Sequence, residues 1–498
     1  MRVRFCGALA PALAAAAVVP ALAQASDADV IRAVNRYGAE VVAADKATRA
    51  SRGDPDTVQR QYDVARDFEE ALRAAGSTSR VCRPLAEAAL RLARAEVRQA
   101  EGYDLPDPAV TAAARRDADA AVARYNAVFS RCHAQPTALP TSTVVLRSPL
   151  PRQAFFDSIS VAGTAPARSA WAVVAVDEPA PACGKGRRRV EVVRGEISLA
   201  LALPEGAHDL EVRFCSPDEQ RGTATVPGVQ VLSPLEDMAA AARTSSPSLS
   251  ARIAKLAERF RGISAVWFHD LRNGRTAAWN AEARFPAAST VKLGLLVAAL
   301  DRFGGRSPVS YDIEAMATWS SNLATNRLLT QVGGSTAGGA AAAQEALTRM
   351  GATRSTFTGA YRVGTGLQRS GEEPPLISSR VTTARDLGRL LYVIHAGASG
   401  GADALARLQL TRAEAQLALG LLLSSQARAD NRGLFRRALG PSTPAAQKHG
   451  WFSVVRHSAA IVYEPDGPKI VVLLTYAPNL DFATAEAYGT RLVRLLGL

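Results

Sequence analysis

The spacing of hydrophobic positions changes twice along the chain, and each spacing predicts a different kind of structure. From residue 26 to about residue 140, hydrophobic residues recur every three or four positions, as in VCRPLAEAALRLARAEV, which predicts amphipathic helices. Gly53-Asp54-Pro55 and the stretch Gly102 to Pro108 interrupt this spacing. We therefore expect an antiparallel helical domain over residues 26–140, in which no residue pattern points to catalysis.

Residues 143–232 have a shorter hydrophobic period. The segments VVLRSP, WAVVAV, ISLALALP and HDLEVRFC are rich in β-branched residues and partly alternating, and Pro, Gly and Asp separate them. This pattern is typical of a small all-β sandwich-like domain. Such domains usually bind or space, and the fold alone does not say which.

Residues 245–498 mix both periods. ARIAKLAERF predicts an amphipathic helix, and two strands follow around Asn273-Gly274, a two-residue hairpin signal. SAAIVYE and KIVVLLTY predict a second hairpin around Pro465-Asp466-Gly467, before a C-terminal helix. Strands at both ends with helices between them predict an α+β fold with one antiparallel sheet flanked by helices.

The first 25 residues have the layout of a secretory signal peptide. Arg2 and Arg4 precede an alanine-rich apolar stretch, which ends in the small-x-small site Ala23-Gln24-Ala25. We expect cleavage there, a mature start near Ser26, and a secreted or periplasmic protein. The alternative is a helix that is not cleaved and anchors the chain, but Pro20 and the small residues favour cleavage.

Four cysteines lie beyond this segment, and an even number in an exported chain predicts disulfides. Four cysteines allow three pairings, of which their grouping favours Cys82–Cys132 and Cys183–Cys215. Four buried thiols are the alternative. The cysteines are too widely spread for a zinc site, and we expect no metal and no other cofactor.

The formal net charge of +13 raises the question of an anionic partner. The one short basic run, Lys185 to Arg189, has no aromatic residues between its charges, so we do not expect nucleic-acid binding. Association with the anionic cell wall through the two N-terminal domains fits the charge better. We expect a monomer.

The stretch FPAASTVKLGLLVAAL carries the first candidate chemistry. Ser289 is expected to open a long apolar helix, and Lys292 would share its face one turn later. A serine needs a base to become a nucleophile, and desolvation biases a buried lysine toward its neutral form. A helix N-terminus also helps to hold an oxyanion. Alone, the pattern is a weak signal, because a capping serine and a snorkelling lysine explain it more often than catalysis does.

Two further motifs follow in order. Trp319-Ser320-Ser321-Asn322 precedes LATNRLL, and Lys448-His449-Gly450 precedes the last hairpin. The order Ser-x-x-Lys, Ser-x-Asn, Lys-x-Gly resembles the signature elements of class A β-lactamases and penicillin-binding proteins. The resemblance covers about Ser250 to Leu498, roughly half of the chain.

The resemblance implies three catalytic residues. Ser289 matches the nucleophile that becomes acylated, Lys292 the amine that moves its proton, and Ser320 the hydroxyl that relays a proton to the leaving nitrogen. Asn326 matches a structural asparagine of the same helix.

It also implies a set of substrate-binding residues. Asn322 would bind the substrate amide, while Lys448 and Gly450 would lie on a strand that lines the substrate and attracts its carboxylate. We expect the oxyanion hole to use the N–H of Ser289 and that of a residue just after Gly450, which we assign to Phe452.

The sequence departs from the family in three motifs and in one spacing, since the distance along the chain from Ser289 to Ser320 is shorter than in typical class A enzymes. Ser321 replaces an aspartate, His449 replaces a threonine or serine, and the Ω-loop motif Glu-x-x-Leu-Asn is absent. Glu372 and Glu373 are the acids in the comparable stretch and therefore the candidate deacylation bases; an exposed turn before Pro374-Pro375 is the alternative.

These residues support three interpretations. The first is hydrolysis of β-lactam rings. The second is cleavage of peptidoglycan peptides by a D-Ala-D-Ala carboxypeptidase, or of esters, on the same scaffold. The third is a β-lactam or cell-wall sensor in which the acyl-enzyme is released slowly, because the usual base is missing.

Overall fold

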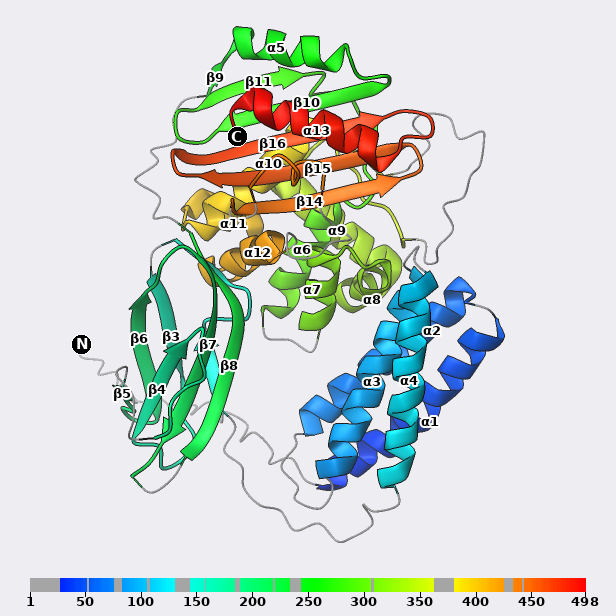
Figure 1. Ribbon diagram of the computed structural model, residues 1–498, viewed down its shortest axis with the longest axis vertical. Coiled ribbons are helices and arrows are strands. Elements are labelled where there is room, and N and C mark those ends of the chain that lie inside the picture. Colours follow the sequence, from blue (N-terminus) through cyan, green and yellow to red (C-terminus); the bar gives the residue numbers. More distant parts are fainter. Residues whose placement is uncertain are drawn as a thin grey trace, which may run out of the picture.

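The computed structural model describes residues 27–51, 53–75, 83–104, 108–129, 144–156, 158–183, 189–217, 220–232, 243–305, 309–361, 380–424, 433–440 and 443–498. Helices come first, then two β-sheets, then a mixed α+β region (Figure 1). The predicted fold class is confirmed. The predicted signal peptide, Cys82, Cys132, Glu372 and Glu373 lie outside the described residues.

Four long helices form the N-terminal region, and their apolar stripes share one core. They are α1 (Asp27–Ala50), α2 (Pro55–Ala75), α3 (Arg83–Asp104) and α4 (Pro108–Phe129). Phe68 and Leu92 are fully buried at its centre. No helix among the described residues is both long and apolar enough to cross a membrane.

The second region contains two sheets that face one another across a shared apolar core. One has the order β1-β3-β6 and the other β2-β8-β7-β4-β5. The strands are β1 (Val145–Ser148), β2 (Ala154–Phe155), β3 (Ser158–Thr164), β4 (Trp171–Val176), β5 (Arg189–Glu191), β6 (Glu196–Ala202), β7 (Gly206–Cys215) and β8 (Gln220–Val231). Cys183 and Cys215 form a disulfide, which confirms the predicted pairing.

The third region is built on a six-stranded sheet of order β14-β15-β16-β10-β11-β9. Its strands are β9 (Thr244–Ser245), β10 (Ile263–Asp270), β11 (Arg275–Trp279), β14 (Ala445–Phe452), β15 (Val455–Glu464) and β16 (Gly467–Tyr476). The sheet is antiparallel as predicted, except that the short β9 runs parallel to β11. β14 is an edge strand.

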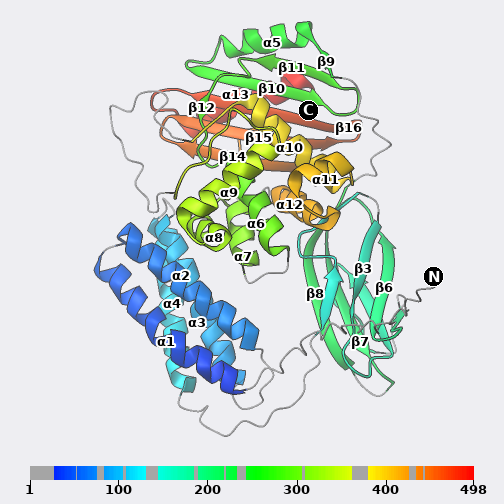
Figure 2. The ribbon, with the colours of Figure 1, turned by 180° about the vertical axis from the view of Figure 1, so that it is seen from behind.

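Helices cover both faces of this sheet (Figures 1 and 2). On one face lie α5 (Pro247–Ala257) and α13 (Phe482–Leu496). Packed on the other side are α6 (Lys292–Phe303), α7 (Ser310–Thr318), α8 (Asn322–Gly333), α9 (Thr336–Arg349), α10 (Ala384–Ala398), α11 (Ala402–Leu408) and α12 (Arg412–Ser424). A short pair, β12 (Phe285–Pro286) with β13 (Val381–Thr382), lies next to α6 in the chain.

The first hairpin differs from its prediction. β10 ends at Asp270 and β11 begins at Arg275, so the loop has four residues rather than two. The Asp270 carboxylate accepts hydrogen bonds from Arg272 N (3.1 Å) and Asn273 Nδ2 (2.9 Å), which closes the longer loop. The second hairpin keeps the two-residue turn, because Glu464 pairs directly with Gly467.

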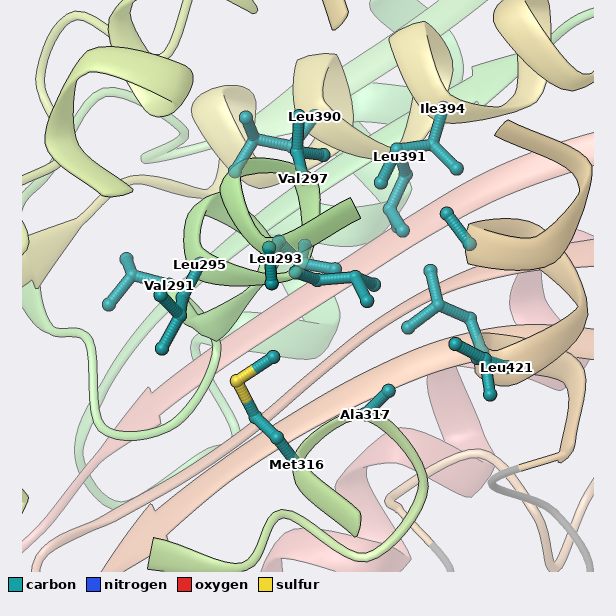
Figure 3. Close-up of a cluster of buried hydrophobic side chains, with 14 of the residues drawn as sticks. Val291, Leu293, Leu295, Val297, Met316, Ala317, Leu390, Leu391, Ile394 and Leu421 are labelled. Carbon is teal, nitrogen blue, oxygen red and sulfur yellow. The ribbon is translucent and has the colours of Figure 1, made fainter. Parts of the chain in front are cut away.

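Helix α6 runs through the largest core and is buried from Lys292 to Leu300. Figure 3 shows Leu293, Leu295 and Val297 among side chains from several helices. A Cβ on Gly294 would lie 2.6 Å from the Ala343 carbonyl oxygen, so this glycine lets α6 and α9 pack closely. A continuous apolar run therefore makes a buried helix with a fixed position.

The β-rich region packs against α12. A Cβ on Gly420 would lie 1.7 Å from the Arg152 carbonyl oxygen, so only glycine fits there. Nearby, Gln153 Nε2 donates to Gln416 Oε1 (3.0 Å), and Arg152 Nε lies 2.8 Å from Glu314 Oε1 on α7. Backbone packing and a few polar pairs thus hold these regions together.

Candidate active site

Ser289 lies in a turn between β12 and α6. Ala287 N donates to the Arg380 carbonyl (2.9 Å), and Lys292 N donates to the Ser289 carbonyl (3.3 Å). The helix begins at Lys292, three residues later than the sequence suggested. Ser289 and Lys292 are still one turn apart, so the expected proximity of hydroxyl and amine does not depend on the helix start.

His457 fixes the chain just before this turn. Its Nδ1 accepts from Thr475 N (3.2 Å), so Nε2 carries the proton and donates to the Pro286 carbonyl (2.8 Å). Burial lowers the pKa of His457 to about 4, which keeps the ring neutral at physiological pH. His457 is a packed residue that positions the turn containing Ser289.

The Lys292 amine is buried and held by groups of the second motif. Its Nζ donates to the Ser320 carbonyl (2.7 Å) and to Asn322 Oδ1 (2.8 Å). The amine also lies 4.3 Å from the centroid of the Tyr361 ring. These contacts join the first and second sequence motifs in one site.

Ser320 connects that site to the third motif. It adopts φ 66°, a left-handed conformation that costs energy for a serine and that the surrounding structure must hold in place. This backbone directs its carbonyl at Lys292, while its Oγ accepts from Lys448 Nζ (2.8 Å). Next to it, Ser321 Oγ caps α8 by accepting from Ala324 N (3.2 Å), which explains a serine where the family has aspartate.

Lys448 is only 1% exposed and contacts neutral oxygens. Besides Ser320 Oγ, Nζ lies 3.4 Å from the His449 carbonyl oxygen. Burial lowers the pKa of Lys448 to about 7. A nearby anion would restore its charge, which suits a group that receives a carboxylate.

Gly450 brings edge strand β14 against the Ser289 turn. A Cβ here would lie 2.9 Å from Ser289 N and 3.0 Å from the Ala287 carbonyl oxygen. Real Cβ atoms do not come that close, so a side chain at 450 would push the strand away. The glycine of the third motif is therefore a requirement of backbone approach.

The register of β14 directs the N–H of Trp451, and not that of Phe452, to the free edge of the sheet. Tyr463 N donates to the Pro444 carbonyl (2.9 Å), and bonding residues alternate along an antiparallel pair. Pro444 and every second residue after it, up to Phe452, therefore bond to β15. The N–H of Phe452 points toward β15, and the N–H of Trp451 points toward the free edge of the sheet. The assignment of Phe452 is wrong for this reason. The Trp451 side chain is 47% exposed.

His449 lies on the opposite face of β14 from Lys448. Its Nδ1 lies 3.1 Å from Ser458 Oγ on the neighbouring strand, and its ring packs over Gly433. Gly433 has φ 68°, and a Cβ there would overlap the ring. His449 therefore helps to close the sheet against the preceding loop.

Tyr361 is the site residue that sequence reasoning missed. Tyr361 N donates to Asn326 Oδ1 (2.7 Å), and Asn326 Nδ2 donates back to the Tyr361 carbonyl (2.8 Å). The phenol donates to the Ala288 carbonyl (3.2 Å), next to Ser289 in the chain. Asn326 is thus the structural partner that was expected, but nothing in the sequence indicated that its partner is a tyrosine 35 residues away.

The structure thus joins most of the predicted site residues through contacts around Ser320 and the Ser289 turn. They are Ser289, Lys292, Ser320, Asn322, Lys448 and Gly450. Within the described ranges, no group of three or more His, Cys, Asp or Glu residues could hold a metal ion. The arrangement brings together the Ser289 hydroxyl, the amines of Lys292 and Lys448, and N–H groups at the edge of β14. These are the kinds of group that acyl transfer requires.

A model of the β-lactamase enzyme family, Beta-lactamase2, matches residues 248–307 and 304–496. Among solved structures, PBP-A is 21% identical and covers 51% of this chain and 96% of its own, with a TM-score of 0.40. An ancestral class A β-lactamase is 21% identical over 50% of this chain and 98% of its own (TM-score 0.39). A β-lactamase from Chitinophaga pinensis is 18% identical over 50% and 98% (TM-score 0.40). No curated protein matches this chain.

Proposed function

Because the chain belongs to the β-lactamase enzyme family, as its C-terminal half shows, we propose that it is an active-site-serine hydrolase that is acylated at Ser289 by β-lactams. The observation that carries this proposal is the position of Ser320, whose carbonyl binds Lys292 and whose hydroxyl binds Lys448. Two amines from separate motifs meet on one serine beside the nucleophile turn. That arrangement provides a proton path from the attacking hydroxyl to a leaving nitrogen.

The chemistry begins at Ser289. Its Oγ attacks the lactam carbonyl carbon, and its proton passes to Lys292, which acts as the base. The N–H groups of Ser289 and Trp451 stabilise the oxyanion. When the C–N bond breaks, the nitrogen takes a proton from Ser320 Oγ, which is replenished from the lysines. Water then hydrolyses the ester and regenerates the serine.

Binding uses charge and one amide. Lys448 pairs with the carboxylate of the substrate, because an anion at this buried amine favours its protonated form. Asn322 binds the substrate amide from the start of α8. The substrate class is therefore an anionic amide, either a β-lactam or a peptide of peptidoglycan.

The neighbour of Lys292 supports a second candidate, a peptidase or sensor with a long-lived acyl-enzyme. Tyr361 lies against the amine, but its hydroxyl donates to the Ala288 carbonyl, and burial raises the pKa of Tyr361. A phenol held in this way does not activate water. Glu372 or Glu373 would have to supply the base for rapid deacylation.

Incubation with a fluorescent penicillin, followed by intact-mass measurement, tests the proposal. We expect wild type to gain one penicillin mass and Ser289→Ala to gain none, whereas the exposed Ser248→Ala serves as the matched control and reacts like wild type. An adduct that disappears within minutes supports lactam hydrolysis, and one that persists for hours supports the second candidate. Absence of any adduct on wild type refutes acylation of Ser289 by β-lactams.

We also propose export and weak association with the cell wall through the N-terminal regions. The disulfide Cys183–Cys215 supports an oxidising compartment, and the net charge of +13 favours an anionic polymer. Fractionation of cells that express the full chain tests export. Co-sedimentation with purified peptidoglycan, at low and high salt, tests the association.

A further inference from the structure

Helix α2 of the N-terminal region lies next to α8 of the catalytic half (Figures 1 and 2), and its side chains also reach α7. Tyr62 OH donates to Asp312 Oδ1 (2.6 Å), and Arg66 Nε lies 3.6 Å from the same oxygen. Tyr62 and Asp312 are fully buried, and Arg66 is 1% exposed. These side chains form a buried interface between two segments about 250 positions apart in the chain.

Arg327 of α8 completes the interface. Its Nη2 lies 2.8 Å from Asp67 Oδ1 and 3.1 Å from Glu70 Oε1, both on α2, and its Nε lies 3.3 Å from Asp312 Oδ2. The guanidinium is 4% exposed. One arginine therefore ties α8 to α7 and both to α2.

Gln59 extends these contacts to the active site. Its Nε2 donates to the Leu323 carbonyl (3.3 Å), and its Oε1 accepts from Asn326 Nδ2 (3.2 Å). Asn326 in turn holds the backbone of Tyr361, whose ring faces the Lys292 amine. The contacts Gln59–Asn326–Tyr361–Lys292 form an unbroken path from the helical region to the proposed base.

The loop between α7 and α8 is short, and one of its residues has a strained backbone conformation. Only Trp319, Ser320 and Ser321 separate α7 from α8, and Ser320 has φ 66°. Such a conformation persists where both flanking elements are fixed. Here α7 is fixed through Asp312 and α8 through Arg327 and Asn326, in each case by α2.

We propose that α2 is a positioning element of the active site, and that Gln59 is a positioning residue that acts through Asn326 on Tyr361 and Lys292. The helical region is then a structural part of the hydrolase and not a spacer. Its effect on acylation rests on the proposed function above, whereas its effect on the order of the loop does not.

Two substitutions at Gln59 in the full chain test this inference. Gln59→Leu removes the hydrogen bonds to Asn326, Leu323 and Asp63, whereas Gln59→Glu keeps an acceptor for Asn326 and loses the donors to Leu323 and Asp63. Arg60→Ala, at an exposed neighbouring position on α2, is the matched control. The readouts are the second-order rate of acylation by fluorescent penicillin, its pH profile, and amide hydrogen exchange of residues 319–326.

We expect Gln59→Leu to slow acylation about 10-fold, to shift the pH profile, and to speed exchange of residues 319–326 about 10-fold. Arg60→Ala should stay within about twofold of wild type, and Gln59→Glu should fall between this control and Gln59→Leu at neutral pH, because it keeps the acceptor for Asn326 but faces the Asp63 carboxylate. Exchange and acylation unchanged in Gln59→Leu would overturn the inference and leave the proposed function intact. If wild type is never acylated, the proposed function fails, and the exchange rates alone decide the inference.

Discussion

The α2 interface and the active site both contain buried cationic side chains. The two sites differ in the groups that these side chains contact. At the α2 interface, Arg66 and Arg327 both face the carboxylate of Asp312, and each has a further acidic partner. In the active site, Lys448 contacts the hydroxyl of Ser320 and a carbonyl oxygen instead. Among the residues that the structure describes, carboxylates neutralise the cation cluster at the α2 interface, whereas Lys448 contacts neutral oxygens.

The pKa values follow this difference. Burial opposes the charge of Arg327, but the carboxylates of Asp312, Glu70 and Asp67 outweigh it and raise the pKa of Arg327. Burial acts on Lys448 without such compensation and lowers the pKa of Lys448 to about 7. The comparison teaches that a paired buried cation holds structure, whereas an unpaired one is available to a substrate anion.

The largest effect should come from removing the unpaired cation. Lys448→Met deletes the donor to Ser320 Oγ and the group that receives the carboxylate, so we expect acylation to slow by about 10³-fold. The fold should lose little, because an apolar side chain suits a buried position. Stopped-flow acylation by fluorescent penicillin measures the rate, with the exposed Lys255→Met as control. A rate within a few-fold of wild type would contradict the role given to Lys448.

Removing the charge of Asp312 at the α2 interface should instead reduce the stability of the fold. Asp312→Asn leaves Arg66 and Arg327 short of one buried carboxylate, which we expect to lower the free energy of unfolding by about 3 kcal/mol. Urea unfolding followed by circular dichroism measures this change. If Asp312→Asn unfolds at the wild-type urea concentration, the interface ions do not hold the structure.

The pH dependence of stability separates the two clusters further. The pKa of Lys448 is about 7 in the folded state and about 10.4 when unfolded, so the unfolded chain binds the extra proton between these values. Stability should therefore rise with pH over this window, by about 2 kcal/mol from pH 7 to pH 9. Unfolding of wild type and Lys448→Met at both pH values isolates this contribution, since the variant should lack it. Parallel slopes would argue against a depressed pKa.

The smallest effect is expected at the partly exposed ion pair between Arg152 and Glu314. Arg152 and Glu314 join the β-rich region to α7 at 2.8 Å, and each side chain is about 30% exposed. Arg152→Ala should cost less than about 1 kcal/mol and leave acylation unchanged, because water screens such pairs. The same urea and stopped-flow measurements apply. A large loss of activity would extend the positioning role from α2 to the β-rich region.

Local patterns predicted most of the fold and the centre of the site. The apolar run after Ser289 becomes the buried helix α6, and the alternating segments around Pro465-Asp466 become β15 and β16. Ser289 and Lys292 are neighbours because a single turn separates them, whether or not that turn belongs to the helix. Short-range spacing is therefore enough wherever the interacting groups lie within one turn or one hairpin.

Long-range contacts could not be predicted in this way. Tyr361 reaches Asn326 from a loop with no periodic pattern, and Gln59 reaches it across 267 positions. The choice between Trp451 and Phe452 depends on which residues of β14 bond to β15, and a one-residue shift reverses the answer. These features arise from tertiary pairing, which motif spacing does not encode.

The outward N–H of Trp451 has a consequence for protein engineering. The donor belongs to the main chain, so nineteen of the twenty amino acids would retain it, and only proline would delete it. The indole, in contrast, is 47% exposed, with the Arg456 guanidinium 5.4 Å from the centroid of its ring. Substituting residue 451 with all other amino acids would therefore change the side chain at this edge of the sheet and leave the main-chain N–H in place. The proline variant would be the control that lacks the N–H.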